Sequence, residues 1–284
     1  MNTVSICVSH RRRSMFTAAF MTCCLIPPCL PDNGYPQAPS PITSSGLNTT
    51  VTNRGAFYDI TGGTRPANGT NLFHSFGEFG VPANTIANFV NDAGLATSNI
   101  LSRVTGGNPS NIFGTIQTTG FGGANLFLMN PAGIVFGPTA SLNVGGSVNF
   151  TTADYLRLTD GARFNALPGL QDAAVSTAPV AAFGFLGSNP GAIIVQGGRL
   201  AVSEGQGLSL VGGTIEVRSG TLENGSSQSA RLSAPGGHIN LASVASPGEV
   251  ATGGALADEP AVNSFASMGA MALAPGSVIS ASGP

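Results

Sequence analysis

The sequence has 284 residues, of which 42% are hydrophobic and 8% are charged, and its formal net charge is −2. So small and slightly negative a charge argues against a nucleic-acid-binding protein, and the hydrophobic share argues against a disordered chain. The 40 glycines, set among many small and β-branched residues, are typical of an all-β architecture with tight turns.

The first 40 residues predict a signal peptide followed by a lead-in linker. A basic cluster at residues 10–13 precedes an apolar stretch at residues 15–30, which is the layout of a secretory signal. The stretch is too short and too interrupted to span a membrane as an ordinary helix. A disordered tail, or initiation at Met15, is the alternative interpretation. All four cysteines lie in this leader, which fits an exported chain that avoids cysteines elsewhere.

Beyond the leader, short apolar runs are separated by glycine pairs. Runs of three to five residues, such as 142–144 and 214–217, stand beside Gly-Gly pairs. Strands this short, with Gly or Asn at the corners, predict a solenoid in which each coil buries its apolar side by stacking on the next. At roughly 20–25 residues per coil, about ten coils would stack to about 50 Å, with Asn ladders at corners. A β-sandwich, with longer strands, is the rival fold.

Several segments depart from this rhythm. Residues 85–91 carry the one plausible helical pattern. Residues 167–190, with three prolines, predict an excursion that leaves the solenoid and packs back on one face. Residues 223–230 predict a polar loop inserted into one coil. Residues 268–274 and 277–279 predict further strands near the C-terminus.

Residues 71–158 are far more specific than the rest. They contain NLFHSFGEFGV at 71–81, NILSRVTGGNPSNIFGTIQ at 99–117, ANLFLMNPAGIVFG at 124–137 and ASLNVGGSVNFTTADYLRL at 140–158. In this order and spacing they resemble the N-terminal secretion domain of filamentous haemagglutinin-like exoproteins. This domain is also called the haemagglutination activity or two-partner secretion domain. The resemblance covers residues 41–245, and we expect residues 246–284 to form further, truncated coils of the same helix.

The resemblance implies a right-handed, single-stranded parallel β-helix with extra-helical strands. It implies the secretion signal of a large exported surface protein or adhesin. The chain would enter the periplasm through the general secretory machinery. There it would be recognised by the periplasmic domains of an outer-membrane transporter of the Omp85 type, and it would fold at the cell surface or outside the cell. Such a domain needs no cofactor and no metal, and an adhesin would also meet a ligand on a host or neighbouring cell.

The family hallmark Asn-Pro-Asn-Gly-Ile reads here Asn130-Pro131-Ala132-Gly133-Ile134. Pro fixes φ, Gly permits a positive φ, and the Asn side chain can cap the turn. Ala132 replaces the second Asn of the family, so we expect the turn to survive with one side-chain hydrogen bond fewer. The candidate transporter-recognition residues are Asn130, Pro131, Gly133, Ile134, Asn125, Asn108 and Pro109.

A polysaccharide-active β-helix enzyme is the alternative function. Such an enzyme needs carboxylates that converge on one face. The only clustered acids are Asp154, Asp160 and Asp172. Asp160 and Arg163 lie in a DGAR sequence that predicts a solvated turn, so we expect no catalytic residue.

Metal and nucleotide sites also lack support in the sequence. His74 and Glu78 are four residues apart, but two further metal ligands are not visible nearby. We expect His74 to pack in a strand with an exposed edge, and His238 to be an ordinary coil residue. P-loop, Gly-x-Ser-x-Gly and calcium-repeat motifs are all missing.

Overall fold

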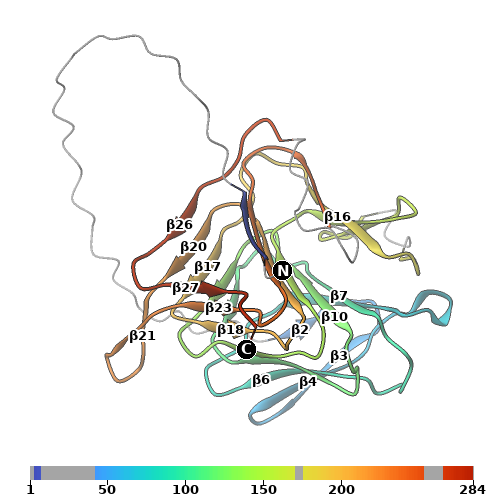
Figure 1. Ribbon diagram of the computed structural model, residues 1–284. Helices are drawn as coiled ribbons and strands as arrows, with labels where there is room; N and C mark the ends of the chain where they lie inside the picture. Colours follow the sequence, from blue (N-terminus) through green and yellow to red (C-terminus); the bar gives the residue numbers. More distant parts are fainter. Residues whose placement is uncertain (1–2, 8–41, 170–174, 253–264, 284) are drawn as a thin grey trace.

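The computed structural model describes residues 3–7, 42–169, 175–252 and 265–283. Within these residues the chain winds into a right-handed, single-stranded parallel β-helix, and each coil adds one strand to each of three walls (Figure 1). The first wall is sheet A, the second is sheet C, and the third is sheet B continued by sheet E. The predicted fold class is therefore confirmed.

Sheet A is the longest wall. In chain order its strands are β1 (Thr3–Cys7), β2 (Thr43–Ser44), β5 (Asn71–Glu78), β7 (Asn99–Val104), β10 (Asn125–Met129), β13 (Val148–Thr151), β19 (Gly207–Gly212) and β24 (His238–Ser243). The short β2 pairs antiparallel with β5, and β1 pairs in parallel with β24. The rest of the predicted leader, with its basic cluster and apolar stretch, lies outside the described residues.

The other two walls are built in the same way. Sheet C contains β8 (Ser110–Ile112), β11 (Ile134–Phe136), β17 (Ile193–Gln196), β20 (Ile215–Arg218) and β26 (Met271–Leu273). Sheet B contains β3 (Thr49–Arg54), β4 (Phe57–Gly62), β6 (Ile86–Val90), β9 (Thr115–Thr119) and β12 (Ser141–Asn143). Sheet E contains β18 (Arg199–Ala201), β23 (Arg231–Ser233) and β27 (Val278–Ser280), so the predicted C-terminal strands are present.

Two expectations about these walls are wrong. Six strands, from β5 to β24, follow one another in parallel in sheet A, where about ten coils were expected. The coils are longer than expected, and one of them includes a large excursion. The helical pattern of residues 85–91 forms β6 instead, because pairing with β4 and β9 overrides local propensity. Ala87 and Phe89 point into the core in the alternation of a strand.

Two small elements complete the helix. The antiparallel hairpin β3–β4 lies at the N-terminal end of the third wall, followed by a short 3-10 helix, η1 (Pro66–Asn68). The predicted polar loop at residues 223–230 is confirmed as part of a hairpin, β21 (Gly220–Thr221) and β22 (Ser227–Gln228), which projects from one corner (Figure 1). No helix in the described part of the chain is long and apolar enough to cross a membrane.

The predicted excursion, together with a strand that follows β24, forms a separate antiparallel sheet, sheet D, against the outer face of sheet A. It contains β14 (Tyr155–Leu158), β15 (Arg163–Asn165), β16 (Val180–Phe185) and β25 (Gly248–Ala251), in the order β15-β14-β16-β25. The excursion leaves the helix at residue 153, earlier than the expected residue 167. The reason is that Tyr155–Leu158 pairs antiparallel within sheet D instead of extending a coil.

Sheet A is consequently buried on both faces. Its inward side chains, such as Leu72 and Leu128, belong to the core inside the helix. Its outward side chains, such as Phe73 and Phe127, belong to a second core beneath sheet D. Burial on both faces explains why residues 126–129 of β10 form a continuous apolar run and do not alternate with polar residues.

Candidate functional site

The Asn130 turn lies at the corner between sheets A and C, just after β10. The Asn130 side chain is fully buried, and its Oδ1 accepts a hydrogen bond from the backbone N–H of Ala132 at 3.0 Å. The Gly133 N–H donates to the Asn130 carbonyl at 3.1 Å, which closes the turn, and Gly133 has a φ of 120°. Ala132 thus uses only its backbone in the turn, and a side chain at position 133 would be strained.

The same Asn side chain also joins two coils. Asn130 Nδ2 donates to the Asn108 carbonyl at 3.1 Å and to Ser110 Oγ at 2.9 Å, both in the preceding coil. Pro109 lies against Gly133, since a Cβ added to the glycine would be 3.7 Å from the Pro109 Cβ. The structure therefore brings Asn108 and Pro109 together with the Asn130 turn.

A second Asn-Pro turn stacks on the other side. Ile134 faces Ile193 in sheet C, so Asn189-Pro190-Gly191-Ala192 takes the same register as the Asn130 turn. The Ile134 N–H donates to the Ala192 carbonyl at 2.9 Å. A Cβ added to Gly191 would come within 2.4 Å of the Pro131 carbonyl oxygen. The repeated Asn-Pro pair is the sequence signal for this turn, which the candidate residues did not include.

The remaining candidates do not belong to the turn. The Ile134 side chain is fully buried in the core inside the helix. Asn125 lies at the opposite end of β10 in a ladder of amides. There Asn99 Nδ2 donates to Asn71 Oδ1 at 2.9 Å, and Asn125 Nδ2 donates to Asn99 Oδ1 at 3.1 Å. The candidate set therefore divides between two corners, and the expected Asn ladder is present at one of them.

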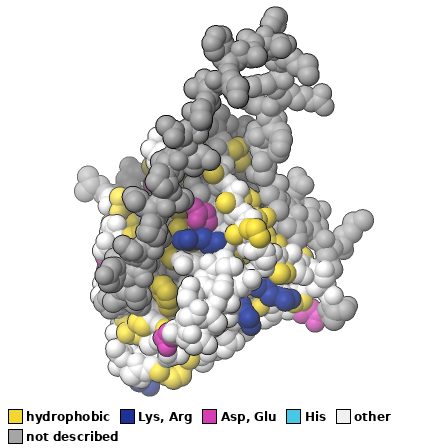
Figure 2. Space-filling view, turned by 90° about the vertical axis from the view of Figure 1, so that its left-hand side faces the viewer, with side chains coloured by type: hydrophobic (Ala, Val, Ile, Leu, Met, Phe, Trp, Pro, Cys, Tyr) yellow, Lys and Arg dark blue, Asp and Glu magenta, His cyan; other side chains and the backbone are white. Residues whose placement is uncertain are grey.

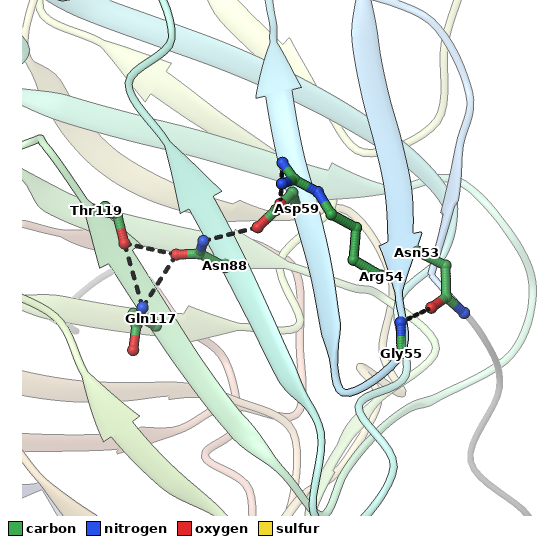
Figure 3. A network of polar contacts seen from close by, with 7 residues as sticks. All are labelled: Asn53, Arg54, Gly55, Asp59, Asn88, Gln117 and Thr119. Atoms are coloured by element: carbon green, nitrogen blue, oxygen red, sulfur yellow. Dashed lines mark hydrogen bonds and ion pairs between the residues drawn. The ribbon is translucent and has the colours of Figure 1, made fainter.

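A second polar ladder runs along sheet B and was not among the candidates (Figure 3). Asn88 Nδ2 donates to Asp59 Oδ1 at 2.8 Å, and Gln117 Nε2 donates to Asn88 Oδ1 at 3.2 Å. Arg54 forms an ion pair with Asp59 at 2.5 Å. The three ladder residues pair directly in the register of β4, β6 and β9. The ladder ties the N-terminal hairpin to the coils.

The acids considered for catalysis serve local structure. Asp154 Oδ2 accepts from the Leu186 N–H at 2.7 Å. Asp160 forms the predicted turn, accepting from the Ala162 N–H at 3.0 Å and from the Ser176 hydroxyl, and these hydrogen bonds lower the pKa of its carboxyl. Asp172 lies outside the described residues. Asp154 and Asp160 occur at opposite ends of β14, so they do not converge on one site.

The structure also does not bring His74 and Glu78 together at one site. His74 is 1% exposed inside the helix, so the expectation of an exposed edge is wrong; the N-terminal hairpin covers it. Glu78 Oε1 accepts from Asn108 Nδ2 at 2.9 Å. His238 begins β24 as the expected coil residue, and its ring lies over Gly207. Over the described ranges, no group of three His, Cys, Asp or Glu side chains could hold a metal ion.

Charged residues are sparse, at 8% of the sequence. Figure 2 shows one face of the molecule, on which a few Arg and acidic side chains are scattered among apolar and uncharged polar atoms. On sheet C, Arg218 lies 3.6 Å from Glu216. A surface of this kind provides little electrostatic attraction for a charged ligand.

The chain is thus a parallel β-helix with stacked corner turns and an extra-helical sheet, and proteins of known kind share this architecture. The family model of the TPS (two-partner secretion) secretion domain matches residues 39–283. The chain therefore belongs to the TPS secretion domain family, which serves exported proteins and works with a cognate outer-membrane transporter. TPS secretion domains are not enzymes. Among curated protein sequences, none matches the chain.

Two solved structures are similar. The filamentous hemagglutinin secretion domain matches with a TM-score of 0.50 and 16% identity, over 84% of this chain and 76% of that one. The HMW1 secretion domain from Haemophilus influenzae matches with a TM-score of 0.49 and 16% identity, over 85% of this chain and 55% of that one. The chain thus spans about half the length of the HMW1 chain. The family implies export through the outer membrane to the cell surface or exterior.

Proposed function

We propose that residues 41–245 carry an export signal that the periplasmic domains of a cognate transporter recognise, and that the chain folds as a β-helix outside the cell. The transporter would be of the Omp85 type and the exported protein a large adhesin, delivered to the periplasm by the general secretory machinery through the leader at residues 1–40. Residues 246–284 would continue the helix. A ligand on a host or neighbouring cell would meet the folded, exported protein.

The observation that carries the proposal is that each coil is built on the coil before it. Asn99 bonds to Asn71 across 28 residues, and Asn125 bonds to Asn99 across 26 residues. Asn130 likewise bonds back to Asn108 and Ser110. A chain that leaves the transporter N-terminus first can therefore stack each new coil on a coil that has already folded. Because a stacked coil resists withdrawal, folding would bias movement outward without a nucleotide.

Recognition would take place before folding. An extended chain offers short strands such as β10, whose backbone can pair with an exposed strand edge of the transporter. The last cysteine is Cys29, so the chain beyond the leader carries no thiol that could form a disulfide loop during passage. The Asn130 turn next to β10 would help define the recognised segment.

The test is co-expression with the cognate transporter, measuring the fraction of the chain that reaches the medium. Export should require the transporter, and Asn130→Ala should reduce export because the backbone and hydroxyl partners of Asn130 lose their hydrogen bonds. That loss costs about 1–3 kcal/mol in the folded domain. Asn143→Ala is the matched control, since the Asn143 amide is exposed on β12 and loses one hydrogen bond, to Gln117 Oε1.

Two outcomes decide the proposal. Export without the transporter would contradict the function. Unchanged export of the Asn130→Ala and Gly133→Val variants would remove the turn from recognition. Unfolding of each purified variant in denaturant separates the two roles: a variant that folds stably yet is poorly exported has lost recognition.

A further inference from the structure

The outer face of sheet A is an apolar surface that sheet D covers, together with flanking residues such as Leu47, Phe265 and Met268. Phe73 on β5, Leu101 on β7, Phe127 and Met129 on β10, Val211 on β19 and Ala242 on β24 each project outward, and all belong to the second core. None of them is more than 6% exposed. The second core therefore extends from the first strand of the parallel run to the sixth.

The excursion is tied to the N-terminal coils. Arg103 on β7 is 3% exposed; it donates from Nη1 to the Asn165 carbonyl at 3.0 Å and lies over the Phe164 ring at 5.2 Å. Phe164 also packs edge-to-face on Phe73, with ring centroids 5.0 Å apart. Asn71, the first residue of the amide ladder, donates to the Ser176 and Ala178 carbonyls at 2.9 and 2.7 Å.

In sheet D, the edge of β16 that does not face β14 is paired with a strand from the C-terminal part of the chain. β25 follows β24 in the chain and pairs antiparallel with β16. Val250 on β25 is fully buried in the second core. Glu249 accepts hydrogen bonds from the Tyr155 hydroxyl and from Arg157 Nε, both at 2.8 Å. Burial raises the pKa of Glu249, but these bonds outweigh it and leave the pKa of the carboxyl below its usual value.

We propose that sheet D is a clasp which closes last, when β25 pairs with β16 and Glu249 meets Tyr155 and Arg157. The inner core of the first four parallel strands and the three excursion strands all precede residue 190, whereas β25 begins at Gly248. Until then the second edge of β16 is unpaired and the second core lacks Val250. The clasp therefore separates two folding events, stacking of coils and covering of sheet A.

The order of these events matters for export, and this part rests on the proposed function. In a chain that leaves the transporter N-terminus first, the outer face of sheet A stays incompletely covered while the six parallel strands from β5 to β24 form. Closure of the clasp then joins the segment after β24 to sheet D, and through sheet D to the N-terminal coils. A chain that has closed the clasp cannot return through the transporter without breaking sheet D as well as the coils.

The experiment follows hydrogen exchange, segment by segment, in the purified full-length chain, so it needs no transporter. The variants are Val250→Ser, which weakens the second core, and Glu249→Gln, which removes the charge of Glu249 and so weakens its contacts with Tyr155 and Arg157. We expect amide exchange in β14, β16 and β25 to become about tenfold or more faster in Val250→Ser, and to a smaller extent in Glu249→Gln. Exchange in β11 and β17, which line the inner core, should stay close to that of the unmodified chain.

Glu216→Gln is the matched control, because Glu216 lies beside Arg218 on the surface of sheet C. It should leave exchange in sheet D unchanged. In pulse-labelling during refolding, the amides of β25 should become protected after those of β11 and β17. The proposal would be overturned if β25 were protected as early as β11, or if both clasp variants accelerated exchange equally in all sheets. Either result is independent of whether the transporter recognises the chain.

Discussion

Acidification should destabilise the folded domain through one buried side chain, His74. Its ring packs against Phe76 and Phe89, with centroid distances of 6.1 and 5.6 Å, and its Nδ1 lies 3.3 Å from Thr49 Oγ1. Burial lowers the pKa of His74 from 6.5 to about 3, because the charged imidazolium would lose its hydration. Asp92 opposes this shift and Arg65 adds to it, but both effects are smaller than burial.

The sign and size of the effect follow from linkage. The unfolded chain binds a proton at His74 below pH 6.5, while the folded domain does not until about pH 3. The contribution of neutral His74 to the free energy of unfolding is therefore fully present above pH 6.5 and falls as the pH drops, by about 1.4 kcal/mol for each pH unit in this window. At pH 5 the loss from His74 amounts to about 2 kcal/mol.

The assay is urea unfolding at pH 7.5 and pH 5, compared between the unmodified chain and His74→Gln. The variant is less stable at both pH values because it disturbs the aromatic packing, but it should lose about 2 kcal/mol less on going to pH 5. Equal losses in the two proteins would refute the reasoning. So would a stability of the unmodified chain that does not change between pH 7.5 and pH 5.

Two further predictions concern the corners. Gly191→Ala should destabilise the domain by about 1–3 kcal/mol, because the new Cβ would lie 2.4 Å from the Pro131 carbonyl oxygen, whereas Gly187→Ala has open space and should change little. Asn99→Ala should cost about 1–3 kcal/mol by leaving two neighbouring amides without their partner, whereas Asn143→Ala removes a single bond of an exposed amide, to Gln117, and should stay within about 0.5 kcal/mol. The free energy of unfolding of the four variants, measured in denaturant, checks both predictions. Equal losses in the two members of a pair would contradict the prediction for that pair.

The helix could be predicted because its signals are local. Short strands, most of them three to six residues long, glycine pairs at their ends and the Asn130 turn all depend on neighbours in sequence. The turn closes with its own backbone, so even the replacement at Ala132 leaves its geometry intact. The Asn ladder followed from the same reasoning, because parallel coils in register bring equivalent side chains into contact.

The errors arose where distant pairing decides the structure. Tyr155–Leu158 reads like another coil strand, and only its antiparallel pairing with β15 and β16 assigns it to sheet D. Ile86–Val90 has an apolar spacing that also fits a helical turn, until β4 and β9 pair with it. The environment of His74 likewise depends on a hairpin formed by other residues.

The β21–β22 hairpin shows how this architecture accommodates extra sequence. Its tip is closed by its own residues, with Ser226 N–H donating to Asn224 Oδ1 at 3.0 Å and Leu222 N–H to the Ser226 carbonyl at 2.9 Å. At its base, Gln228 Nε2 donates to the Gly197 carbonyl at 2.6 Å. The added length therefore leaves undisturbed the pairing of β20 with β17 and of β23 with β18, the strands on either side of the hairpin in the chain. A foreign epitope placed at this tip would be displayed outward without a change in the winding of the polypeptide.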